Sequence, residues 1–209
     1  MNKKILFLEF LILYFLAPIL FILFFQGFPL IPFIMGIGVV GFIILYFDST
    51  FSFKHTFSLS HIKNSDKRVT LFIVSIIIAA LGFYRFQEEQ ILFLVREFSY
   101  FTILLPIFYT LFSVIPQTLF YRTLFFHRYA QLFQIKHIQI IISALVFSIA
   151  HIVLFNLEAV IITFVGGLIF SYYYEKDKSI LGSVIEHGAY GSVLFLLGFG
   201  VFLYSGAQV

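Results

Sequence analysis

Two histidines lie within otherwise lipophilic stretches of the chain, His151 in VFSIAHIVLF and His187 in GSVIEHGAYG. An imidazole at membrane depth costs free energy unless it is paired or used, so such a residue is a candidate functional site by default. Imidazole also exchanges protons near neutral pH and binds metal ions. The two histidines are therefore the first candidates for chemistry inside a membrane.

The residues around these histidines bear on whether the imidazoles have a chemical role. Phe147 precedes His151 by four residues, so its ring covers the helix face that carries the imidazole. Gly191 follows His187 by one helical turn and leaves that imidazole face open, whereas Glu186 is rotated from it by about 100°. A carboxylate beside a histidine is costly in lipid, which favours a chemical role. The alternative is that the histidines only hydrogen-bond across helices.

A third polar group follows Pro116, which removes one backbone hydrogen bond and is expected to bend its helix. Thr118 and Arg122 are four residues apart and share a helix face, while Gln117 is rotated from Arg122 by roughly 140°. The alternative for Arg122 is that it extends to the cytoplasmic interface beside Arg128.

Together these groups predict one polar chamber between three helices. An amide, a hydroxyl, a guanidinium, a carboxylate and two imidazoles come from Gln117, Thr118, Arg122, Glu186, His151 and His187. Such groups can polarise a water molecule and stabilise an oxyanion. His151 and His187 would be the ligands if a zinc ion were bound, but no H-E-x-x-H spacing supports a metal. We expect no cofactor.

The composition defines the elements that must position these groups. Of the 209 residues, 61% are hydrophobic and 11% are charged, which indicates an integral membrane protein. Seven apolar runs are long enough to be spans: 5–25, 28–47, 69–86, 99–126, 138–155, 157–174 and 179–205. We predict an all-α, polytopic bundle that forms a single domain over residues 1–209. Glycines such as Gly36, Gly38, Gly41 and Gly167 are expected to let helices approach closely.

The charges predict the orientation of the bundle. If the N-terminus is cytoplasmic, ten of the 13 basic residues fall on the cytoplasmic side. We therefore expect a bacterial cytoplasmic membrane as the location, with an external C-terminus. The polar loop 48–68 carries His55 and His61, which we expect to be ordinary surface residues. Nothing in this pattern requires a nucleic-acid partner.

The order of the motifs resembles the CPBP family, the CAAX prenyl protease or abortive-infection type of intramembrane protease, over roughly residues 100–205. That family has the motifs E-E-x-x-x-R, F-x-x-x-H and H-x-x-x-N. Here Arg122, Phe147, His151 and His187 match those motifs. The resemblance implies that a glutamate activates water, while the histidines and the asparagine position the water and stabilise the tetrahedral intermediate.

The chain departs from this pattern where the family has its carboxylates. Gln117 and Thr118 stand in place of the two glutamates, and Gly191 stands in place of the asparagine. Neither an amide nor a hydroxyl is a usable base near neutral pH. Glu186 is the first candidate for a substitute base, followed by His151 or His187.

Three functions remain open on these residues. The first is an intramembrane endopeptidase, weakened by the missing glutamates, that cleaves a membrane-anchored or hydrophobic peptide near the cytoplasmic leaflet. The second is an inactive scaffold or immunity-type protein that binds a partner peptide. The third is a small transporter with His151 and Glu186 as a proton relay. One geometric difficulty is that His151 lies roughly 20 Å along its span and His187 about 12 Å, which places them at different depths.

The orientation gives the first testable prediction. Single cysteines at Lys63 and Gln208 should react with impermeant thiol reagents from opposite faces of the membrane, because five of the seven predicted spans, an odd number, lie between these two positions. The chain has no native cysteine, so the unsubstituted protein is the control. Labelling of both positions from the same face would contradict the seven-span arrangement.

Overall fold

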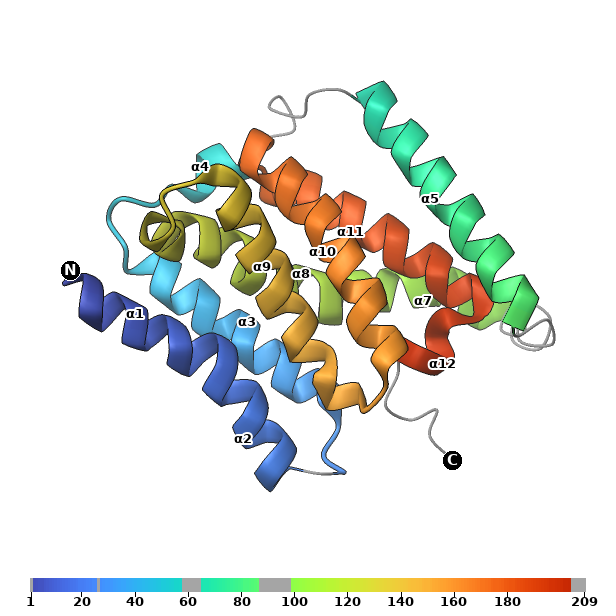
Figure 1. The fold of residues 1–209 in the computed structure, drawn as a ribbon, viewed down its shortest axis with the longest axis horizontal. Helices are drawn as coiled ribbons and strands as arrows, with labels where there is room; N and C mark the ends of the chain where they lie inside the picture. The colour runs from blue at the N-terminus through green and yellow to red at the C-terminus, as the bar shows by residue number, and fades with distance from the viewer. Residues whose placement is uncertain (1, 26, 58–64, 87–98, 204–209) are drawn as a thin grey trace.

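The computed structural model describes residues 2–25, 27–57, 65–86 and 99–203, and all regular structure within them is helical. The predicted all-α bundle is therefore confirmed (Figure 1). The first half of the chain contains α1 (Lys3–Leu11), α2 (Ala17–Phe24), α3 (Leu30–Tyr46), α4 (Phe53–Thr56) and α5 (Ser65–Phe86). The second half contains α7 (Ser99–Tyr109), α8 (Ile115–Thr118), α9 (Lys136–Ala150), α10 (Leu157–Asp177), α11 (Ile180–Leu194) and α12 (Gly200–Leu203).

Each predicted span coincides with a helical segment. In the described part of the chain, five helical stretches are long and apolar enough to cross a membrane: Lys3–Phe24, Thr102–Leu132, Lys136–Leu154, Leu157–Asp177 and Ile180–Phe199. A shorter apolar helix, α3, and the 22-residue α5 account for the other two predicted spans. The protein is thus an integral membrane protein. His61 and most of the predicted external stretch around residues 85–97 lie outside the described residues.

The longest span changes its helical pitch around Pro116. Wide π-type turns cover η3 (Thr110–Val114) and η4 (Leu119–Tyr129), on either side of the short α8 that contains Pro116. Proline cannot donate a backbone hydrogen bond, and π-type turns are frequent at functional sites. The regular α-helical pattern is therefore interrupted on both sides of Pro116, whereas the bend predicted there stays a prediction.

Close helix approach occurs at some of the expected glycines. A Cβ built on Gly38 would lie 2.5 Å from the side chain of Pro116, so α3 can contact α8 only because residue 38 has no side chain. Gly167 of α10 similarly lies against Ala144 of α9, with only 3.0 Å between a built Cβ and the Ala144 Cα. A Cβ built on Gly36 would meet no atom of another described element within 4 Å, so the expectation of close approach is wrong for that residue.

Polar contacts attach the N-terminal helices to the span that carries Gln117. The Tyr14 hydroxyl donates a 2.8 Å hydrogen bond to the carbonyl of Phe120. Glu9 of α1 accepts hydrogen bonds from Arg128, at 2.7 and 3.0 Å, and from the Tyr129 hydroxyl.

In the loop after α3, hydrogen bonds from Thr50 hold the pKa of Asp48 below its usual range.

Helix α5 lies apart from the other N-terminal helices, along the outer side of α11 (Figure 1). Its attachment is a polar seam: Arg68 pairs with Asp177 at the end of α10, and the Ser75 hydroxyl donates to the Tyr190 hydroxyl of α11 at 3.2 Å. Arg68 and Ser75 are seven residues apart and therefore share one helix face.

Candidate active site

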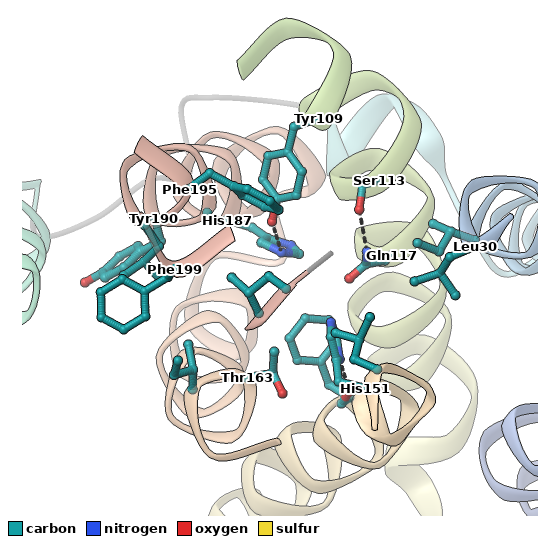
Figure 2. A pocket seen from close by; sticks show the side chains of 18 of the residues that line it. Leu30, Tyr109, Ser113, Gln117, His151, Thr163, His187, Tyr190, Phe195 and Phe199 are labelled. Carbon is teal, nitrogen blue, oxygen red and sulfur yellow. Dashed lines mark hydrogen bonds between the residues drawn. The ribbon is translucent and has the colours of Figure 1, made fainter. Parts of the chain in front are cut away.

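A cavity of about 1230 Å³ lies between the helices of the two halves of the chain. Its wall is largely apolar and includes Phe21, Phe25, Ile34, Ile76, Phe108, Phe112 and Ile169, from both halves of the chain. Polar side chains also reach it, among them Tyr109, Ser113, Gln117, His151 and His187 (Figure 2). The cavity therefore combines a large lipophilic volume with a small number of polar groups, as ligand sites usually do.

His151 stands where α9 ends and tightens into the 3-10 turn η6 (His151–Leu154). Its Nδ1 lies 2.7 Å from the carbonyl oxygen of Phe147, one turn earlier. A carbonyl can only accept, so Nδ1 carries the proton and the lone pair of the neutral ring is on Nε2. The backbone thus fixes which nitrogen can act as a base.

His187 is 7% exposed and lies between two aromatic rings. Its ring stacks on Phe170 with centroids 4.8 Å apart and meets the edge of Phe147 at 5.5 Å. The Phe147 ring also contacts His151, at 4.7 Å, as the four-residue spacing predicted. Both histidines line the same cavity and contact the same ring, although they lie at different distances from the starts of their helices. That they act as one site stays a prediction.

Gln117 lines the same cavity as the two histidines (Figure 2). Its amide nitrogen donates a 2.7 Å hydrogen bond to the Ser113 hydroxyl, and its Oε1 has no hydrogen-bond partner among the described residues. The side chain is 7% exposed, so this oxygen is a buried acceptor without a donor. A water molecule or a substrate N–H would satisfy it.

Two further polar residues of this site, Tyr109 and Ser113, were not predicted from the sequence. The Tyr109 hydroxyl lies 3.2 Å from Nε2 of His187, and Ser113 holds the amide of Gln117. The sequence does contain a pattern that indicates them: Tyr109, Ser113 and Gln117 are spaced four residues apart and therefore share one helix face.

Arg122 and Thr118 lie behind the cavity wall rather than in it. Arg122 is 2% exposed, its Nη1 donates to Ser143 Oγ at 3.1 Å, and its guanidinium lies 4.6 Å from the Phe147 ring centre. The alternative that Arg122 extends to the interface beside Arg128 is therefore wrong. Its Nε and Nη2, and the Thr118 hydroxyl, have no hydrogen-bond partner among the described residues.

Glu186 is also not among the residues that line the cavity. Its rotation from His187 turns it toward α5, where Oε1 lies 3.8 Å from Arg68 Nη1 in the polar seam. Its Oε2 is buried without a hydrogen-bond partner among the described residues. Glu186 and His187 thus face different partners although they are adjacent in sequence.

The described residues contain no group of three or more His, Cys, Asp or Glu side chains placed to hold a metal ion. His151 and His187 therefore have no third ligand of these types within the described part of the chain. Zinc sites in proteins use three or four such ligands.

Comparison with known proteins identifies the class of the fold and site. Residues 99–193 match the family described as Rce1-like, type II CAAX prenyl endopeptidase. This stretch contains Tyr109, Gln117, His151 and His187, and its match confirms the resemblance to the CPBP proteases. No curated protein and no solved structure matches the chain.

Nε and Nη2 of Arg122, which have no hydrogen-bond partner among the described residues, lead to a prediction about stability. Thr118 precedes Arg122 by one turn on the same helix face, so a carboxylate there can pair with Nε and Nη2 as a bidentate acceptor. We expect Thr118→Glu to be more stable than Thr118→Gln by roughly 1.5–3 kcal/mol, because hydrogen bonds to charged groups contribute that much.

The two variants have nearly the same volume, so their difference in melting temperature in detergent isolates the charge. Arg122→Met should remove the advantage of glutamate over glutamine at position 118. Equal melting temperatures of the two Thr118 variants would mean that a carboxylate at position 118 does not pair with Nε and Nη2 of Arg122.

Proposed function

We propose that this protein is an intramembrane endopeptidase that hydrolyses a peptide bond in a membrane-anchored or hydrophobic peptide near the cytoplasmic leaflet. The observation that carries the proposal is the presence of Gln117, His151 and His187 around one cavity. All three lie within the stretch that matches an endopeptidase family. An amide and two imidazoles in a water-restricted site are suited to binding a carbonyl group and activating water.

The cavity wall supports a lipid-modified peptide as the substrate. Its phenylalanine and isoleucine side chains come from α2, α3, α5, α7 and α10. Burial of an alkyl or prenyl chain there gains roughly 0.8 kcal/mol for each CH₂ group. Binding energy from this remote chain can hold the peptide bond beside the polar side chains of the cavity.

His151 is the base that the geometry supports best. Its Nε2 carries the lone pair, and it lines the cavity, whereas the carboxylate of Glu186 does not. In the proposed reaction, Nε2 takes a proton from water as the oxygen bonds to the peptide carbonyl carbon. The C–N bond then breaks, and the leaving nitrogen receives that proton from His151, which regenerates the base. Gln117 Oε1 accepts a hydrogen bond from the attacking water.

A second candidate function is a protein that binds such a peptide without cleaving it. It is favoured by Gln117 and Thr118, since neither side chain is a usable base where the family has glutamates. A peptide-binding protein would use the same cavity, so binding alone does not separate the two functions.

The test is cleavage of a fluorogenic prenylated peptide by the purified protein in proteoliposomes. His151→Gln should lower kcat by about 10²-fold or more, the usual contribution of a general base. Gln117→Glu should raise it by a factor of about 10 to 100, because a carboxylate in the cavity adds a stronger base beside the water site.

Glu186→Gln distinguishes the two candidate bases. Normal cleavage by this variant is expected, since Glu186 lies in the seam with Arg68. Loss of activity in Glu186→Gln but not in His151→Gln would assign the base to Glu186. If neither the unsubstituted chain nor Gln117→Glu cleaves a peptide that both bind, the endopeptidase proposal fails and the binding function stands.

A further inference from the structure

Gly191 on α11 is packed against the ring of Tyr109 from α7. A Cβ built on Gly191 would lie 2.2 Å from the Tyr109 hydroxyl oxygen and 2.5 Å from Cζ of the same ring. Real Cβ atoms do not approach other atoms so closely. The absence of a side chain at position 191 is therefore what admits the Tyr109 hydroxyl to this place.

The hydroxyl that fills this space is also part of the polar group of the cavity. Tyr109 lines the cavity, and its hydroxyl lies 3.2 Å from Nε2 of His187 (Figure 2). The Tyr109 ring packs on Phe195, with centroids 5.3 Å apart, and this apolar contact helps to fix the position of the hydroxyl that the ring carries. A phenol has one donor and can accept as well.

We propose that the Tyr109 hydroxyl, placed by Gly191, is a hydrogen-bond donor to the carbonyl oxygen of the peptide, a role that rests on the proposed function. When Nε2 of His187 donates to the Tyr109 oxygen, the phenolic O–H is left free for the substrate. Negative charge on that oxygen increases when water adds to the carbonyl, so the bond strengthens in the transition state. Tyr109 is then a catalytic residue contributed by α7.

The direct test measures binding without turnover. Two inhibitors are compared, a prenylated peptide aldehyde, which binds as its tetrahedral hydrate, and the matching primary alcohol, which has no such geometry. Tyr109→Phe should weaken binding of the aldehyde about tenfold or more and leave the affinity for the alcohol within about twofold, as expected for one lost hydrogen bond.

Tyr14→Phe is the matched control. Tyr14 is buried and its hydroxyl donates to the Phe120 carbonyl, but it does not line the cavity. Its removal should leave the ratio of the two affinities unchanged. An unchanged ratio in Tyr109→Phe as well would overturn the proposal, even if the protein cleaves peptides.

Exchange of the two side chains tests the placement by Gly191. Gly191→Asn alone should lower the melting temperature, because the new side chain collides with the ring of Tyr109. Tyr109→Ala in the same chain should recover most of the loss. If Gly191→Asn is as stable as the unsubstituted protein, Tyr109 does not occupy the space and the proposal fails.

The outcomes separate this inference from the proposed function. Cleavage with a normal affinity ratio in Tyr109→Phe retains the endopeptidase and removes Tyr109 from its machinery. Loss of aldehyde binding in a protein that does not cleave supports the donor role of Tyr109, while the endopeptidase proposal fails on its own assay.

Discussion

The ring of Phe147 is the contact on which the polar interior of this membrane protein depends. Its centre lies 4.6 Å from the guanidinium carbon of Arg122, 4.7 Å from the His151 ring and 5.5 Å from the His187 ring. The residue is 3% exposed. A buried cation is stabilised by the face of an aromatic ring, and the same ring also contacts the two imidazoles. One apolar side chain thus packs against three polar groups within the bundle.

The cost of burying a polar group without a partner also explains where the other polar groups lie. Arg122 donates a hydrogen bond to Ser143 behind the cavity wall. His151, which lines the cavity, donates one to the backbone of its own helix. The groups that remain incompletely satisfied include Oε1 of Gln117, which faces the cavity. Incomplete satisfaction of a buried polar group is unfavourable for stability and favourable for binding a ligand. The arrangement therefore points to a site that a substrate and water complete.

The sequence predicted the helical bundle and its main histidines because both follow from hydropathy. Apolar runs of span length and an imidazole within them need no tertiary information. The side of a helix that a polar residue faces was harder to predict, since it depends on the neighbouring helices. The sequence alone does not decide whether Arg122 faces the interface or the interior. It favours Glu186 as a base, whereas in the fold Arg68 of α5 lies beside the Glu186 carboxylate. The helical spacing places Tyr109 on the face of Gln117, but its packing against Gly191 of another helix depends on tertiary structure.

The central claim is that one cavity, built by both halves of the chain, receives the lipid chain and the peptide together. The most direct measurement is photocrosslinking of a prenylated peptide with a photoreactive group at the end of its lipid chain, followed by mass spectrometry. We expect the label on cavity residues such as Phe112 and Ile76, with protection by excess unlabelled peptide. Label confined to outward-facing residues that do not line the cavity, such as Leu8 and Leu81, with no effect of the competitor, would contradict this claim.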